Sequence, residues 1–517
     1  METDLVIFWF VSLACISGLF VLIKRHRSGV RGWIALYAAI LLLAVAGKLL
    51  GKSLFIYCAG ALWLLLVMLP GFLSRFYYRC FLQQRYRVAR HVARLVGVFH
   101  PADGWLQIPK VLLALEVAQQ GDVTAATEAL KGIQGVKSAV GLAAVLNLYR
   151  LTNRWEELLA WQTNAGILPR HPELLSTLLR AYGETGDRHG LLQLYDRNKH
   201  AIAGLVPAAS RDLCRLMLFS FCGKRRLVEQ LFAGTLAMLP MPIKQFWLAT
   251  SDLGAGDLES ARRQFEELLP TADPPLRLAI ERRLSHISVL PEPLDASTEQ
   301  VIEEATREHS HDQSFGAQRS LFSKQARATQ MLIALNCLMF VVETLQGGST
   351  NPETLYRLGA LFPPDVRAGQ WWRLGASLFL HWGPLHLAMN MFALWILGPF
   401  AEFALGFRRY LLVYLFAGIG SMGTVMAFAT GPKGEELAVG ASGCIMGLVG
   451  ATGALMLRGW VREKAHAARR RLVAVILVIC MQTVFDALIP QVSMTAHLSG
   501  VVLGFIGTLL VRDKLAK

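Results

Sequence analysis

The sequence predicts an all-α polytopic membrane protein that also carries a soluble helical domain. Hydrophobic residues make up 54% of its 517 residues, and many stand in runs of about 20, the length of a helix that crosses a bilayer. Between two groups of such runs, apolar residues recur at helical spacing among charged ones, which is typical of a soluble helical domain. We therefore expect four parts: an N-terminal membrane region over 1–79, a soluble domain over 80–285, a linker over 286–328 and a six-helix membrane domain over 329–517.

The N-terminal region contains three apolar runs, at about 5–23, 33–50 and 54–73. Four Lys or Arg residues between 24 and 31 follow the first run, and six arginines between 75 and 94 follow the third. Since basic residues collect in cytoplasmic loops, both clusters predict the cytoplasmic side and place the N-terminus outside. The first run lacks a basic leader and a cleavage signal, so we interpret it as a retained span rather than a removed signal peptide.

The soluble domain contains a repeat. Its turn dipeptides begin 32, 33, 37 and 33 residues apart and are Gly121-Asp122, Asn153-Arg154, Gly186-Asp187, Gly223-Lys224 and Gly256-Asp257. In the segments that start at these turns, one aligned position holds Leu130, Tyr195, Phe232 and Phe265, whereas Gln162 breaks the pattern. A period near 34 with a small residue at the turn resembles the tetratricopeptide repeat, whose stacked helix pairs form a concave surface. The alternative is an irregular helical bundle. For the repeat domain we expect a cytoplasmic protein partner.

The segment that follows has the composition of a linker, with Pro291 and Pro293 among polar residues. We interpret His309 and His311 as solvated rather than metal-bound, because no cysteine or carboxylate cluster nearby has zinc-like spacing. The eight cysteines form no CxxC pair, so neither a disulfide framework nor a metal site is expected, and no cofactor is implied. The net charge of +15 fits basic cytoplasmic loops, so we expect no nucleic-acid partner.

Six spans follow, at about 329–346, 385–404, 410–429, 440–457, 472–489 and 494–511. The segment before the second span contains Trp371-Trp372-Arg373, which predicts packing at the membrane interface. If the soluble domain is cytoplasmic, the second, fourth and sixth spans run from outside to inside and the C-terminus is cytoplasmic. The basic residues after the second, fourth and sixth spans agree with this orientation.

Two polar residues enter the membrane from the same face. Ser442 follows the polar turn at 433–436, and His497 follows Pro490-Gln491, so both lie roughly one to two turns below the outer surface. Small residues flank both and are four apart in each helix, which lets two backbones approach closely: Gly443 and Gly447, and Gly500 and Gly504. Taken alone, a membrane serine more often bonds its own helix, and a membrane histidine is also compatible with a proton relay or an interhelical bond.

The residues around these positions carry a family resemblance. The matching segments are His381–Asn390 (HWGPLHLAMN), Gly440–Gly443 (GASG) and Ala496–Gly504 (AHLSGVVLG), with Trp372-Arg373 and Glu402 in place. Over residues 329–512 the chain resembles the rhomboid intramembrane serine proteases. The resemblance implies a six-helix core with a catalytic dyad, and it does not extend to residues 1–328.

The resemblance also implies roles for individual residues. Ser442 would be the nucleophile and His497 the general base. His386, Asn390 and the Ser442 backbone N–H would hold the oxyanion in a cavity that includes Gly440, and His381 would line its mouth. Trp372 and Arg373 would belong to the interfacial loop. Asp486, near the outer end of the fifth span, is either a third catalytic member or an interfacial acid, and the sequence leaves both alternatives open.

We therefore expect an intramembrane serine endopeptidase that cleaves transmembrane segments of other membrane proteins near the outer face through an acyl-enzyme. One alternative is a catalytically silent rhomboid-like protein that binds client helices while its repeat domain recruits a cytoplasmic partner. The other is a transporter, but no intramembrane acid pairs with Lys or Arg along a route across the bilayer. The charge bias and the lack of a transit or signal segment favour a bacterial cytoplasmic (inner) membrane.

Overall fold

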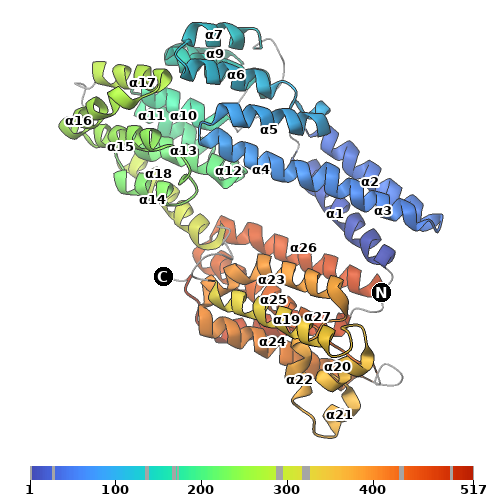
Figure 1. Cartoon of the computed structure of the whole chain (residues 1–517). Coiled ribbons are helices and arrows are strands. Elements are labelled where there is room, and N and C mark those ends of the chain that lie inside the picture. Colours follow the sequence, from blue (N-terminus) through green and yellow to red (C-terminus); the bar gives the residue numbers. More distant parts are fainter. Residues whose placement is uncertain are drawn as a thin grey trace. The chain divides into compact units, whose positions relative to one another are not determined.

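The computed structural model describes residues 3–25, 30–133, 139–165, 171, 174–286, 295–316, 326–429, 436–488 and 493–515. Within these ranges the regular elements are helices, and one isolated antiparallel bridge joins Leu361 to Ala438. Eight of the described helices are long and apolar enough to cross a membrane, so the predicted all-α polytopic fold class is confirmed. The chain forms two units, Glu2–Thr306 and Arg307–Lys517, and each is described by itself (Figure 1).

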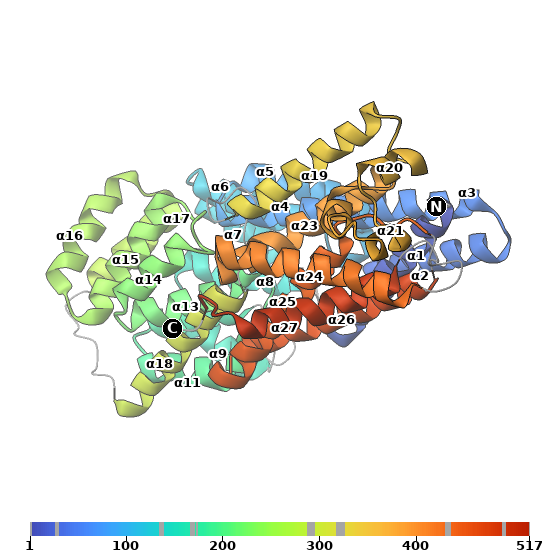
Figure 2. The same ribbon diagram turned by 90° about the horizontal axis from the view of Figure 1, so that it is seen from below.

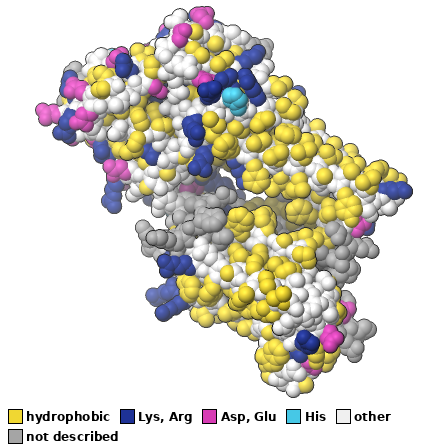
Figure 3. All heavy atoms as spheres, viewed as in Figure 1, with side chains coloured by type: hydrophobic (Ala, Val, Ile, Leu, Met, Phe, Trp, Pro, Cys, Tyr) yellow, Lys and Arg dark blue, Asp and Glu magenta, His cyan; other side chains and the backbone are white. Residues whose placement is uncertain are grey.

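The first unit begins with three apolar helices at the predicted positions. They are α1 (Thr3–Arg25), α2 (Arg31–Leu49) and a third helix made of α3 (Ser53–Trp63), a π-helical turn (Leu64–Met68) and α4 (Leu69–Leu82). On the face shown in Figure 3, hydrophobic side chains cover α3 and α4, in keeping with contact with lipid. The third helix continues to Leu82, so the boundary that we predict at residue 79 lies inside it.

A buried polar contact holds the start of the helical domain to these membrane helices. After α5 (Tyr86–Phe99) the chain makes a short turn in which the Asp103 carboxylate accepts a hydrogen bond from the Gly32 N–H at 2.8 Å. The His100 ring stacks on Trp33 at 3.7 Å, and its Nε2 bonds the Leu66 carbonyl of the π-helical turn at 3.0 Å. Together with the packing of α5 against α4, this contact joins the membrane helices and the helical domain in one unit.

Each predicted turn dipeptide separates two helices of a pair. The pairs are α6 (Ile108–Gln119) and α7 (Val123–Lys131), α8 (Ala139–Thr152) and α9 (Trp155–Ala165), α10 (Leu175–Glu184) and α11 (Arg188–Arg197), α13 (Ala208–Phe221) and α14 (Arg225–Ala233), and α15 (Met241–Ala255) and α16 (Leu258–Leu268). The first residue of every such turn has a positive φ, between 52° and 110°. Three of the turns end in an aspartate that caps the second helix. The assignment of these pairs to the tetratricopeptide family stays a prediction.

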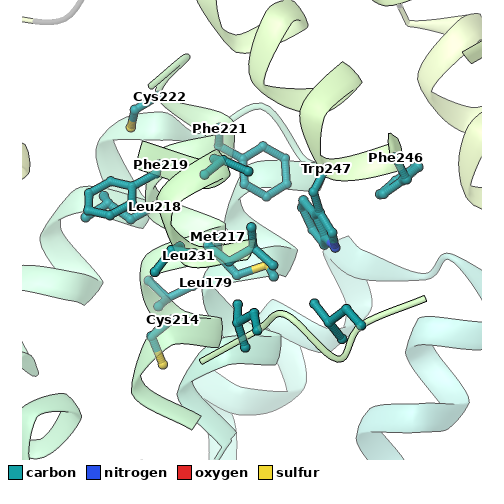
Figure 4. Close-up of a cluster of buried hydrophobic side chains, with 14 of the residues drawn as sticks. Leu179, Cys214, Met217, Leu218, Phe219, Phe221, Cys222, Leu231, Phe246 and Trp247 are labelled. Atoms are coloured by element: carbon teal, nitrogen blue, oxygen red, sulfur yellow. The ribbon is translucent and has the colours of Figure 1, made fainter. Parts of the chain in front are cut away.

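The core of the helical domain is formed by the inward faces of these pairs. Figure 4 shows part of it, with Leu179 from α10, Phe221 from α13 and Trp247 from α15 in one cluster. The aligned apolar residues Leu130, Tyr195 and Phe265 are buried, and Phe232 is half-buried. Two further helices complete the described part of this domain, α12 (Lys199–Ala203) and α17 (Pro274–Ser285), and α18 (Ala296–His311) follows them.

The predicted linker contains a helix. Residues 296–316 form α18 and a π-helical turn, and within them His309 and His311 are only 4% and 9% exposed. The prediction that these histidines are solvated is therefore wrong, because His311 packs near Phe315, which is buried against Gly459. The rest of the linker at 287–294 and 317–325, including both prolines, lies outside the described residues.

The second unit contains a helix at each of the six predicted spans; five of these are among the eight described helices long enough to cross a membrane, and the sixth, of 17 residues, is shorter. The six helices are α19 (Arg327–Leu345), α23 (Gly383–Leu405), α24 (Phe407–Phe428), α25 (Ser442–Glu463), α26 (His466–Leu488) and α27 (Met494–Leu510), with the short helices α20 (Pro352–Leu358), α21 (Pro363–Arg367) and α22 (Arg373–Ala376) after the first. Of the candidate spans, α25 is the most deeply buried, and it packs against α23, α24, α26 and α27 (Figure 2). The helix that begins at Ser442 is thus the centre of this unit.

Candidate active site

Ser442 is the first residue of the central helix. Gly440, two residues earlier, has a φ of 129°, and its N–H donates to the Ser377 carbonyl at 2.9 Å. A methyl group on Gly440 would lie 2.8 Å from Cε1 of His386, so both its backbone conformation and its surroundings require glycine. The Ser442 side chain is half-buried. Residues 433–435 of the predicted polar turn lie outside the described residues.

The backbones of α25 and α27 touch at the predicted glycines. A methyl group on Gly500 would lie 2.3 Å from the Gly443 carbonyl oxygen, and one on Gly504 would lie 2.0 Å from that of Gly447. Side chains larger than hydrogen therefore cannot stand between these helices. Ser442 adjoins the first of these contacts on α25, and His497 lies three residues before it on α27.

The structure thus brings Ser442 and His497 to one level of two touching helices. Among the described residues it forms no hydrogen bond between the Ser442 hydroxyl and the His497 ring, so their direct contact stays a prediction. Catalytic hydrogen bonds in enzymes without substrate are often long and tighten only in the complex. Residues 490–491, which precede His497 in the predicted outer turn, lie outside the described residues.

The His497 ring is held from a third helix. Its Nδ1 lies 2.8 Å from Oδ2 of Asp486, and Nε2 of Gln482 donates to Oδ1 of Asp486 at 2.7 Å. Asp486 and His497 are both buried, so this acid is a partner of the histidine rather than an interfacial charge. The bond places the ring proton on Nδ1 and leaves the lone pair of Nε2 to accept a proton.

His386 and Asn390 lie one turn apart on α23. The Trp382 N–H donates to Nδ1 of His386 at 3.2 Å, which leaves the proton of the neutral ring on Nε2. That Nε2 would be 3.1 Å from a methyl group on Gly440, so a donor lies next to the segment that leads into Ser442. One amide hydrogen of Asn390 bonds the His386 carbonyl at 3.0 Å, and the other is not used by that bond.

His381 lies behind His386 rather than at an open mouth. Its side chain is fully buried, and its ring meets the His386 ring edge to face at 5.3 Å between centroids. Its backbone N–H donates to the carboxylate of Glu343, a buried acid in α19, at 3.0 Å. Burial by these neighbours therefore does not fit the predicted place of His381 at the cavity mouth.

Arg373 fastens the predicted interfacial loop. Its guanidinium donates to the carbonyls of Tyr356 at 2.8 Å and Ala360 at 3.0 Å, and it pairs with Asp365 at 3.2 Å. The neighbouring Trp372 is exposed. The buried arginine thus stabilises the loop through these contacts, and the tryptophan lies on the surface of the loop.

Glu402 caps the first helix of this unit. Its two carboxylate oxygens accept three hydrogen bonds at 2.8 Å, from the backbone N–H groups of Ala328 and Thr329 and from the Thr329 hydroxyl. Sequence reasoning named Glu402 but missed Gln482 and Glu343. Gln482 stands four residues before Asp486 and thus on the same helix face, and Glu343 is an acid inside a predicted span.

Comparison with known proteins supports the family resemblance predicted for the second unit. Residues 368–514 match the family described as Rhomboid domain. YdcA of Bacillus subtilis, whose assignment as a rhomboid protease is provisional, is 30% identical over 188 residues, which cover 35% of this chain and 87% of YdcA. The chain belongs to the rhomboid family. The predicted rhomboid resemblance is therefore confirmed, and the chain is an integral multi-pass membrane protein.

Other rhomboid relatives cover less of their own length. Rhomboid protease GluP of Bacillus subtilis is 36% identical over 177 residues, which are 34% of this chain and 33% of GluP. RHOMBOID-like protein 5 of Arabidopsis thaliana is 34% identical over 152 residues, which are 29% of this chain and 48% of that protein. The chain thus spans about a third to a half of these two relatives. No solved structure matches it significantly.

Proposed function

We propose that the rhomboid domain is an intramembrane serine endopeptidase with Ser442 as nucleophile and His497 as general base. The observation that carries this proposal is the Asp486-bonded His497 ring, whose Nε2 is left to accept a proton beside the helix that begins with Ser442. The second support is the rhomboid family itself, in which relatives such as GluP are named proteases.

The proposed reaction uses these groups in two steps. The Ser442 hydroxyl attacks the carbonyl carbon of the substrate amide while its proton moves to Nε2 of His497. The imidazolium then gives that proton to the leaving amine, the C–N bond breaks, and an acyl-enzyme remains. Water, deprotonated by the same ring, hydrolyses the ester and returns Ser442. A placed base contributes about 10²- to 10⁴-fold to such a rate.

The attack of Ser442 on the carbonyl carbon gives a tetrahedral intermediate, whose oxyanion needs hydrogen-bond donors. We assign this role to the Ser442 backbone N–H, Nε2–H of His386 and the second amide hydrogen of Asn390. The tautomer of His386 set by Trp382 supports its part in this set. Each such donor is worth about 10²- to 10³-fold in kcat.

The proposed substrates are transmembrane helices of other proteins. Their peptide bonds are protected by helical hydrogen bonds, so segments rich in glycine and other weak helix formers should be cut preferentially near the outer interface. In the proposed orientation the N-terminus lies outside, and the helical domain and the C-terminus lie in the cytoplasm of a bacterial inner membrane. The helical domain would then bind a cytoplasmic protein.

The test is cleavage of a reporter in liposomes. The reporter is a fusion whose transmembrane helix carries a Gly-Ala segment in its outer third. Full-length protein should cut it and Ser442→Ala should not. Ser499→Ala is the matched control, because this hydroxyl on α27 bonds its own helix at the Thr495 carbonyl, and it should cut normally.

Two outcomes would count against the proposal. Cleavage that persists in Ser442→Ala would reject Ser442 as the nucleophile. A wild-type protein that binds the reporter without cutting it would favour the catalytically silent alternative. If the reporter is cut as expected, comparison of the ectodomains shed by cells with and without Ser442 would identify the natural substrates.

A further inference from the structure

We infer that Asp486 and Gln482 are positioning residues for His497, so that the site is a serine–histidine–aspartate arrangement completed by α26. This inference rests on the proposed function, and it adds an acid to the dyad that the family resemblance implies. The geometry behind it is a closed set of contacts: Nδ1 of His497 lies 2.8 Å from Oδ2 of Asp486, and Nε2 of Gln482 lies 2.7 Å from Oδ1 of Asp486 and 3.4 Å from Nδ1 of His497.

Burial makes the contact between Asp486 and His497 energetically important. The side chains of Asp486 and His497 are 1% and 7% exposed. A carboxylate in such surroundings is costly unless its oxygens are satisfied. Here each oxygen faces one donor, the ring N–H on one side and the Gln482 amide on the other, which is the arrangement that suits an ionised carboxylate, an acceptor only.

The same contacts define what the acid does for the base. The bond to Nδ1 selects the tautomer with its lone pair on Nε2 and fixes the rotation of the ring. When Nε2 takes the proton of Ser442, the ring becomes a cation beside the negative charge of Asp486, which stabilises it. Gln482, one helical turn before Asp486 on α26, holds the carboxylate in place. Neither residue of α26 touches the reacting atoms in this arrangement.

The experiment separates this role from a merely structural clamp. Asp486→Asn keeps the shape and the ability to bond His497 but removes the charge. With the liposome reporter, kcat should fall about 10²- to 10⁴-fold, while KM and the unfolding temperature change little. Gln482→Leu should lower kcat by roughly 10-fold. Thr483→Val is the matched control, because its hydroxyl bonds the Ile479 carbonyl of its own helix, and its kcat should stay within about twofold.

A second readout does not depend on activity. In protein with ¹⁵N-labelled histidine, the Nδ1 proton of His497 should give a strongly downfield signal that moves upfield in Asp486→Asn, where the acceptor is neutral, and disappears in His497→Ala. A wild-type spectrum without this signal would overturn the inference. So would a cleaving enzyme whose Asp486→Asn variant keeps the wild-type kcat, and that result would leave the proposed function standing.

The remaining outcomes are also decisive. If the wild type does not cleave, the proposed function fails, and the Nδ1 signal alone decides whether Asp486 positions His497. If Asp486→Asn does not fold, Gln482→Leu takes its place: reduced kcat at unchanged KM supports the inference, and unchanged kcat overturns it.

Discussion

Replacing Gly504 with alanine would place a methyl group 2.0 Å from the carbonyl oxygen of Gly447 and 2.6 Å from its Cα. Ordinary van der Waals contact begins at 3.4 Å, so α25 and α27 must separate by about 1.4 Å, the difference between the first distance and this limit. The obstructing atoms belong to a backbone and cannot rotate away. Overpacking of this kind costs about 1–3 kcal/mol of unfolding free energy.

The separation of α25 and α27 should also change the distance between Ser442 and His497. Gly504 lies seven residues from His497 on the same helix, and a displacement of about 1 Å between reacting groups costs roughly 10²-fold in rate. We expect Gly504→Ala to be labelled by a fluorophosphonate about 10²-fold more slowly than the wild type and to unfold at lower temperature in detergent. Both quantities are measured on the same purified preparation.

Gly423→Ala is the matched control. This glycine also lies in a membrane helix, α24, and a methyl group there would meet nothing within 4 Å. Its labelling rate should equal that of the wild type, and its stability should be unchanged or raised by up to about 1 kcal/mol. If Gly504→Ala matched the wild type in both measurements, the close contact of α25 with α27 would not be the feature that sets the geometry of the site.

Three further predictions concern two buried charged side chains of the second unit and two buried thiols of the helical domain. Glu402→Gln removes the charge that accepts three bonds at the start of α19, so the unfolding free energy in detergent should fall by about 1–3 kcal/mol. Arg373 donates from Nη1 to two carbonyls, from Nε to Gln370 and from Nη2 to Asp365. A lysine ammonium cannot reach all of these acceptors, so Arg373→Lys should lower the unfolding free energy by a similar amount, about 1–3 kcal/mol. Burial raises the pKa of Cys214 and Cys222 from 9.0 to about 12; at pH 8 these thiols stay protonated, and each should react with a disulfide reagent about 10³-fold more slowly than in the unfolded chain.

Each of these predictions has a matched comparison. Glu353→Gln and Arg357→Lys change exposed side chains of α20 and should leave the unfolding temperature in place. Equal losses in these controls would show that any charge change in this unit destabilises it. For the buried thiols the reference is the same protein in denaturant, and rapid reaction in the folded protein would contradict their burial.

The sequence predicted the membrane helices because each is marked by its own composition. Apolar runs of sufficient length located the spans, and the small residues at Gly443 and Gly500 indicated which helices approach closely. The third helix was predicted to end near residue 73, whereas it continues to Leu82. Its last turns contain Arg75 and Arg79 and so lack the apolar signal that marks a span.

Features that depend on the rotation of one helix against another could not be predicted. The alternatives for Asp486 stayed open because spacing along α26 does not say which face meets α27, and only the packed structure places its carboxylate on His497. His309 and His311 were misread for a related reason. A polar composition resembles a linker until the chain is seen to bury one face of a helix there.

The central claim is that Ser442 is a nucleophile activated by His497. The most direct test is to treat the purified protein in lipid with a fluorophosphonate and to map the modified residue by mass spectrometry of its peptides. The account predicts a single adduct on Ser442 in the wild type and its loss in His497→Ala. An adduct on another residue, or equal modification of Ser442 in His497→Ala, would contradict it.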